Sequence, residues 1–316
     1  MSGQATQRGR PLAAVALLLL AAACAKPPEL DPRYRPTQSV LEVVAVLRRH
    51  VADDTYRFPP ARDFTGRNVY RASLLRLENL EAAHADALRA GALDDVIAFS
   101  KGRALERIRA FDLAAASYRR AAERGGPLEL EALRSASVCE TLDEAARILP
   151  DATSGPPARP EALAIFDQRS ALLAALLAEA EGSHYTAVIR EEAERATLAR
   201  ARYLADTRRL YPDGDVRALA AMQKLVVDHR ESKNTNGHLL SLADLYAELA
   251  VEYVQRHPPE SLAFDPPHFE ELVESAARMY EAVSNQDGRA EKLEAARRLE
   301  AFLAFTLKVD RDRFSP

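Results

Sequence analysis

Helical periodicity runs through most of this chain of 316 residues, and it restricts the folds that the chain can adopt. Val40, Val44, Leu47 and Val51 recur at i, i+4, i+7 and i+11, a spacing that places them on one face of a helix. The alternation of apolar and polar residues that is typical of half-buried strands is nearly absent. The chain has only 12 glycines, which cluster at breaks between periodic stretches. The sequence therefore predicts an all-α protein with about twelve helices.

Glycine and proline mark where the predicted helices end. Gly91 follows one helix as a C-cap, and the Gly125–Pro127 stretch ends another. Beyond the first amphipathic stretch, the predicted helices cover residues 68–90, 93–109, 112–124, 128–140, 143–149, 161–181, 184–210, 213–230, 236–256, 267–285 and 288–307. Asp112 and Asp265 are expected to be N-caps. The proline-rich stretch 151–160 is the strongest linker pattern, and it divides the chain into predicted subdomains at 39–150 and 161–316.

The first residues have the layout of a secretory signal peptide. Two arginines precede an uncharged apolar run from Leu12 to Ala23, which is shorter than the roughly 20 residues that a membrane span needs. The predicted signal peptide covers residues 1–23. Residues 24–38, which are rich in proline and charge, are expected to form an extended tether.

The stretch from Leu20 to Cys24, LAAAC, resembles the lipobox of bacterial lipoproteins. The resemblance implies cleavage before Cys24, acylation of Cys24, and anchoring of the chain in a membrane through the acyl chains. Ala25 follows the cysteine instead of Asp, which in Gram-negative lipoproteins favours the outer membrane, facing the periplasm. The sequence departs from the family at Ala21, where leucine is most common. Ordinary secretion, giving a soluble secreted or periplasmic protein with Cys24 unmodified, is the alternative.

Composition argues against nucleic acid as a partner. The 43 Lys and Arg residues are outnumbered by 47 Asp and Glu, and no basic tract is present to neutralise phosphates. If Cys24 is acylated, Cys139 has no partner for a disulfide. Cys139 lies in a helical pattern and is expected to be a small buried apolar residue.

Sequence motifs give no support for catalysis or for a cofactor. The HExxH, GxSxG, phosphate-loop and dinucleotide-binding motifs are absent from the sequence, so we predict no catalytic residue, no cofactor and no enzymatic activity. One local cluster could converge on a metal ion: His257, Glu260, Asp265, His268 and Glu271. Helix capping accounts better for these residues, and no metal site is predicted. The acidic pairs at 53–54 and 191–192 are expected to be solvated.

Residues 95–127 resemble a tetratricopeptide repeat (TPR). Gly102 and Leu105 occupy the small and large positions of the first helix, and Ala114, Tyr118 and Ala121 occupy the small–aromatic–small positions of the second. Small residues let two helices approach, while the aromatic residue fills the space between hairpins. The chain thus resembles a TPR-type bacterial lipoprotein, which implies a right-handed solenoid of antiparallel helix hairpins.

The repeat pattern departs from the family in several places. Pro127 stands one place late for the terminal proline of the repeat, and the resemblance is weaker over 128–150 and 238–285. The spacing between successive repeats is also irregular. A helical bundle with alanine-rich seams is the alternative fold.

The resemblance implies a function in binding other proteins. A TPR groove holds a partner peptide with polar side chains of its inner helices, which by position would be Arg103, Glu106 and Arg107. A solvated helix surface is the alternative for these three residues. The expected partners are other envelope proteins, in an assembly, secretion, pilus or motility complex. A cell-wall enzyme and a small-ligand or lipid-binding protein are the alternative functions, although no small-molecule substrate is evident.

Overall fold

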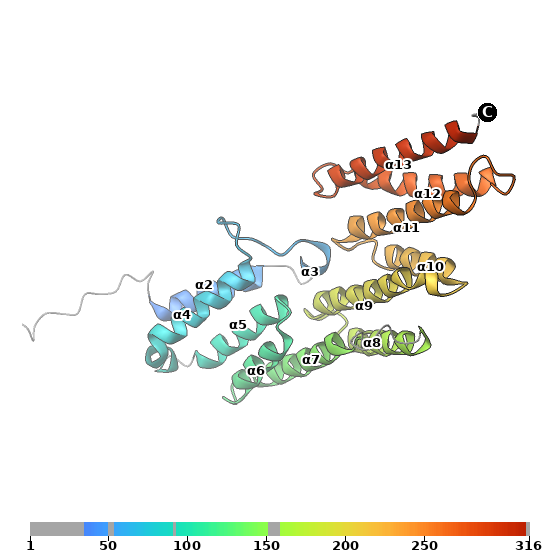
Figure 1. Ribbon diagram of the computed structural model, residues 1–316. Coiled ribbons are helices and arrows are strands. Elements are labelled where there is room, and N and C mark those ends of the chain that lie inside the picture. Colours follow the sequence, from blue (N-terminus) through green and yellow to red (C-terminus); the bar gives the residue numbers. More distant parts are fainter. Residues whose placement is uncertain (1–34, 50–53, 91–92, 151–158, 314–316) are drawn as a thin grey trace, which may run out of the picture.

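The computed structural model describes residues 35–49, 54–90, 93–150 and 159–313 (Figure 1). Within these ranges the protein has no strand, so the predicted all-α class is confirmed. The described helices are α2 (Pro36–Arg49), α3 (Asp54–Arg57), α4 (Val69–Ala90), α5 (Asp94–Arg107), α6 (Phe111–Ala122), α7 (Glu129–Arg147), α8 (Arg159–Glu179), α9 (Thr186–Asp206), α10 (Gly214–Asp228), α11 (Thr235–Arg256), α12 (Pro266–Ser284) and α13 (Lys292–Arg313), with a short 3₁₀ helix at Arg208–Leu210. Among them, none combines the length and apolar character that crossing a bilayer requires.

The helices from α4 to α13 are stacked in chain order. Each of them contacts the next one along the chain, and α2 packs against α4 and α5 (Figure 1). The row is curved, and the short α3 lies between helices α4 and α5 on one side and helices α9 to α11 on the other. Packing that is dominated by neighbours in sequence is typical of helical-repeat proteins.

Helix α9 joins two hydrophobic clusters of the row. Phe111 of α6 and Leu142 of α7 belong to the same buried cluster as Leu173 of α8 and Ile189 of α9. Further along α9, Leu204 belongs to a second cluster that is formed with α10 to α13. Most of the predicted linker, residues 151–158, lies outside the described residues, and the helices on its two sides share one core.

Several element boundaries differ from those predicted. A single helix, α7, replaces the two helices predicted over 128–149, because Leu142, which stands in the expected break, is buried against α8 and α9. Asp112 does not cap α6, which begins one residue earlier at the buried Phe111. Helix α2 begins at Pro36, inside the range predicted for the tether.

The residues that carry the TPR resemblance are buried in the α5–α6 hairpin. Gly102 and Leu105 of α5 and Ala114, Tyr118 and Ala121 of α6 are all buried. They form the contact between the two helices, together with the half-buried Phe99 and other neighbours. The helical hairpin predicted by this spacing is therefore present.

Candidate functional site: the junction around helix α3

Helix α3 is a four-residue segment held between distant parts of the chain. Asp54, Thr55 and Tyr56 are each at most 6% exposed, although a segment of this length has no apolar face of its own. Helix α3 contacts α9, and its polar groups bond to α4, α5 and the turn between α10 and α11. We define the α3 junction as this segment and the residues that bond to it.

The acidic end of α3 is bound by α4 and α5. Asp54 accepts a hydrogen bond from Arg107 Nη1 at 3.0 Å and another from the Tyr70 hydroxyl. Arg107 Nη1 also donates to the Thr55 hydroxyl at 3.2 Å. Burial, reinforced by the hydrogen bond to Asp54, raises the pKa of Tyr70 above its usual range, so Tyr70 remains a donor. The Asp54 carboxylate thus lies against one cation and one hydroxyl, all of them buried.

The other end of α3 is bound by the turn between α10 and α11. The Tyr56 hydroxyl shares a hydrogen bond with His229 Nδ1 over 3.2 Å. The backbone N–H of Lys233 donates to the Tyr56 carbonyl at 2.9 Å, and the Lys233 ammonium donates to the Thr55 carbonyl. Burial lowers the pKa of His229, which favours the neutral imidazole beside the phenol.

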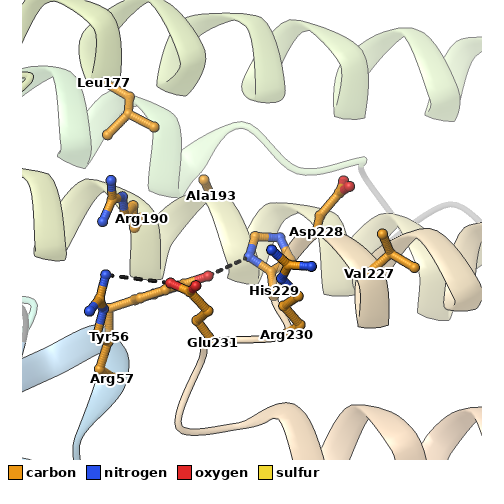
Figure 2. A pocket seen from close by; sticks show the side chains of 10 residues that line it. All are labelled: Tyr56, Arg57, Leu177, Arg190, Ala193, Val227, Asp228, His229, Arg230 and Glu231. Atoms are coloured by element: carbon orange, nitrogen blue, oxygen red, sulfur yellow. Dashed lines mark hydrogen bonds and ion pairs between the residues drawn. The ribbon is translucent and has the colours of Figure 1, made fainter.

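A cavity of about 500 Å³ opens beside Tyr56 (Figure 2). Its lining comes from α3, α8, α9, α10 and the following turn: Tyr56, Arg57, Leu177, Arg190, Ala193, Val227, Asp228, His229, Arg230 and Glu231. The Oε2 atom of Glu231 lies 3.4 Å from Nη2 of Arg57, and a dashed line in Figure 2 marks this ion pair. Within the described residues, Arg190 and Arg230 make no ion pair, so the cavity has an excess of positive charge.

A second cavity of about 330 Å³ adjoins the first. It shares Arg57, Arg230 and Glu231 with the first cavity and adds Lys233 and Arg289, among others. The two cavities therefore meet at the arginine that ends α3. Both are lined by charged and polar side chains, which suits the binding of polar chain segments better than the binding of an apolar ligand.

Three glutamates of α9 are buried next to the α3 junction. Glu191, Glu192 and Glu194 are each at most 8% exposed, so the expectation that residues 191–192 are solvated is wrong. Glu191 binds Lys233 at 3.1 Å and Arg195 at 2.7 Å, the second being an i, i+4 pair. Glu192 accepts two hydrogen bonds from the Arg109 guanidinium. Side chains from distant parts of the chain meet each acid, and such partners are not visible in the local sequence pattern.

Glu194 is held in its charged form by several donors. Its Oε1 atom lies 2.6 Å from His238 Nε2 and accepts from the Ser232 hydroxyl at 2.6 Å and from the Asn234 amide at 3.3 Å. Burial by itself raises the pKa of Glu194, but the hydrogen bonds from these groups outweigh it and hold the pKa below its usual range. The turn that holds Lys233 against α3 is thus tied to α9 through Ser232 and Asn234.

The pKa of Glu106 is shifted in the opposite direction. Glu106 is fully buried, and burial raises its pKa in spite of the nearby Arg103 and Arg107. Oε2 of Glu106 accepts from the Tyr118 hydroxyl at 2.7 Å, while Oε1 has no hydrogen-bond partner among the described residues. The His184 ring, whose pKa burial lowers to about 2, has its Nε2 atom 3.8 Å from Oε1.

The three residues predicted to line an open groove do not form one. Glu106 is 1% exposed and Arg107 is 9% exposed, while Arg103 is half-buried with its Nε atom 3.8 Å from Glu106. Burial against α3 and α6 leaves Glu106 and Arg107 no free surface for a partner. Arg107 does bind a peptide segment, but that segment is the chain's own α3. The expectation that Asp54 is solvated is wrong, because its carboxylate is buried against Arg107 and Tyr70. Nothing in the sequence singled out Tyr56, because four residues between loops give no periodicity to detect.

Three other candidates from the sequence remain: the cluster from His257 to Glu271, Cys139 and Cys24. Within the described part of the chain, no group of three or more His, Cys, Asp and Glu is placed to hold a metal ion. The rings of His257 and His268 both contact the Tyr253 ring, and Asp265 is the N-cap residue of α12 without a side-chain cap. Cys139 is a buried free thiol, as expected, and burial raises its pKa. Cys24 lies outside the described residues.

Comparison with known proteins gives no family for this chain. No protein-family model matches it, and no curated protein matches it either.

Proposed function

We propose that this protein is a lipoprotein anchored to the outer membrane through Cys24, and that it acts in the periplasm as a scaffold for other envelope proteins. The folded part would be a TPR-like solenoid whose inner surface binds segments of partner proteins. The partners would belong to an envelope assembly, secretion, pilus or motility complex. The proposal assigns the protein no catalytic residue and no cofactor.

One observation carries the scaffold proposal: at its α3 junction, the helical row holds a short polar peptide segment. Asp54, Thr55 and Tyr56 are bound through side chains and backbone carbonyls by residues of α4, α5 and the α10–α11 turn. Peptide-recognition domains use the same kinds of contact. The close α5–α6 hairpin and the stacking of helices in chain order support a repeat architecture. The N-terminal sequence pattern supports the anchor.

The anchor is tested by comparing the wild-type chain with Cys24→Ser in native membranes. We expect the wild-type chain to fractionate with the outer membrane and to carry the mass of its acyl chains, because two or three chains bury dozens of methylenes at about 0.8 kcal/mol each. Cys24→Ser should lose both properties. Cys139→Ala is the matched control, because it removes a cysteine and leaves the anchor. An unacylated wild-type chain in the soluble fraction would contradict the anchor.

The scaffold function is tested by crosslinking in intact cells, followed by recovery of the protein. We expect a defined set of envelope proteins to be recovered with the wild-type chain and to be depleted with Cys24→Ser, which no longer holds the scaffold at the membrane. Recovery of the same background proteins with both chains would contradict the scaffold function, even if the anchor is confirmed.

A further inference from the structure

Helix α3 is bound in its junction through the kinds of contact that a receptor makes with a bound peptide. The segment supplies mainly acceptors: the Asp54 carboxylate and the carbonyls of Thr55 and Tyr56. The surrounding helices supply the donors, which are Arg107, Tyr70 and both nitrogen atoms of Lys233. These donors are separated from the α3 residues that they bind by between 16 and 178 positions in the sequence, so the site is complete without α3 itself.

We propose that the α3 junction is a peptide-binding site, that α3 fills it within the same chain, and that a partner protein competes for it with a segment carrying Asp two positions before Tyr. This inference rests on the scaffold function proposed above and names the chemistry of the partner. In the resting protein, α3 is the occupant. In the complex, the partner's segment replaces it.

The spacing of the two recognised side chains follows from the two ends of the site. At one end, Arg107 Nη1 and the Tyr70 hydroxyl converge on a carboxylate, so Asn in place of Asp54 would keep the shape and lose the charge-assisted bond. At the other end, His229 meets a phenol at 3.2 Å, and Phe in place of Tyr56 would leave the ring and lose this hydrogen bond. Lys233 binds the backbone carbonyls of Thr55 and Tyr56, and the Thr55 hydroxyl accepts a hydrogen bond from Arg107 Nη1 at 3.2 Å.

The cavities next to Arg57 leave room for a partner segment longer than α3. They measure about 500 and 330 Å³ and meet at Arg57 and Glu231. Arg190 and Arg230 face the larger cavity without an ion pair among the described residues (Figure 2). A segment that continues with acidic residues beyond its tyrosine would meet these two cations, so acidic continuation is favoured.

Because α3 occupies the site, a free peptide must compete with α3, and this competition lowers the apparent affinity of the peptide. A segment of the same chain acts at an effective concentration on the order of millimolar, so a free peptide binds weakly while α3 is in place. Weakening the contacts of α3 should raise the apparent affinity for a free peptide, because the competitor is lost and the receptor groups remain.

The test uses the full chain and a fluorescent peptide of residues 54–61, DTYRFPPA. Fluorescence anisotropy compares the wild-type chain with Asp54→Ala/Tyr56→Ala. We expect the peptide to bind the variant at least tenfold more tightly than it binds the wild type. A control peptide with Asn and Phe at the positions of Asp54 and Tyr56 should bind the variant at least tenfold more weakly than DTYRFPPA. Equal affinities for the two chains, or for the two peptides, would overturn the proposal.

A second measurement does not depend on the folding of the variant. Hydrogen–deuterium exchange is followed in the wild-type chain with an excess of DTYRFPPA. If the peptide displaces α3, the amides of residues 54–57 exchange faster, while those in the middle of α11 do not change. Unchanged exchange at 54–57 with a saturating peptide would overturn the proposal.

The peptide-binding and crosslinking experiments together distinguish a failure of the Asp-x-Tyr site from a failure of the scaffold function. If envelope proteins are recovered by crosslinking but DTYRFPPA binds neither chain, the scaffold function remains and the Asp-x-Tyr site is wrong. If the peptide binds the variant specifically but no envelope protein is recovered, the site stands and the scaffold function fails.

Discussion

Gly102 of α5 lies directly against the ring of Tyr118 of α6. A Cβ atom at residue 102 would stand 2.8 Å from the Cδ1 and Cε1 atoms of that ring, closer than carbon atoms can pack. The ring has little freedom to move, because Tyr118 is fully buried and its hydroxyl donates to Glu106 at 2.7 Å. Glycine is therefore required at this point for the two helices to approach.

Gly102→Ala should destabilise the protein. Overpacking typically costs about 1–3 kcal/mol, and alanine recovers up to about 1 kcal/mol over glycine within a helix, so we expect a net loss of about 1–2 kcal/mol in the free energy of unfolding. Urea unfolding followed by circular dichroism measures this loss. Gly237→Ala in α11 is the matched control, since a Cβ at residue 237 meets no atom within 4 Å, and it should be neutral or stabilising. Equal effects of the two substitutions would show that the α5–α6 contact is not as close as described.

The Gly102–Tyr118 contact also shows what the sequence could reveal about the fold. The resemblance to a tetratricopeptide repeat placed a small residue and an aromatic residue on two successive helices, and the structure brings them together. The signal is local, because both residues lie in one hairpin. Helix α7 was harder to predict, because Leu142 is kept in the helix by burial against α8 and α9, which no pattern within residues 128–149 contains.

The α3 junction could not be predicted for the same physical reason. Asp54 and Tyr56 are buried by contacts with residues far along the chain, such as the Tyr56 contact with His229, which lies 173 positions away. Acidic residues in a helical pattern are usually solvated, so Glu191 and Glu192 gave no sign of burial. Burial of charge depends on partners from other helices, and only the packed structure shows which partners they are.

Glu194→Gln should destabilise the protein in a pH-dependent way. The hydrogen bonds from His238, Ser232 and Asn234 hold the pKa of Glu194 below its usual range, so its charged form stabilises the folded state above the unfolded-state pKa. This contribution is lost as the pH falls through the lowered pKa. We expect a cost of about 1–3 kcal/mol at pH 7 that shrinks towards acidic pH.

Urea unfolding of Glu194→Gln and the wild type across pH measures this difference. Glu294→Gln is the control, because Glu294 forms a half-exposed pair with Arg298 and should cost less than about 1 kcal/mol. A cost for Glu194→Gln that stays constant down to the acid transition would contradict the assigned hydrogen bonds.

Cys139 should be inert in the folded protein. The thiol is buried and its pKa is raised by burial, so the reactive thiolate is scarce and cannot be reached. We expect no reaction with Ellman's reagent in buffer. In denaturant, chains purified from membranes should give one thiol each if Cys24 is acylated and two if it is not. Cys139→Ala should remove one of them, and rapid reaction of the native wild-type chain would contradict the burial of Cys139.

Glu106→Gln should have the opposite pH dependence to Glu194→Gln. Burial raises the pKa of Glu106, so the folded state binds the proton more tightly than the unfolded chain does. The wild type therefore loses stability as the pH rises from the usual glutamate pKa, about 4.3, through the raised pKa, because a buried carboxylate must then be charged. Gln keeps the shape and can still accept from Tyr118 while carrying no charge. We expect the stability of the variant relative to the wild type to increase from pH 4 to pH 8.

Denaturant unfolding at a series of pH values measures the difference between Glu106→Gln and the wild type. Glu144→Gln is the control, because Glu144 is an exposed residue of α7, and this substitution should change the free energy of unfolding by less than about 0.5 kcal/mol. If Glu106→Gln instead loses stability relative to the wild type as the pH rises, the carboxylate is stabilised by Arg103 and Arg107 more than burial penalises it. The interior of the α5–α6 hairpin would then have to be considered an ion-pair network and not the site of a neutral buried acid.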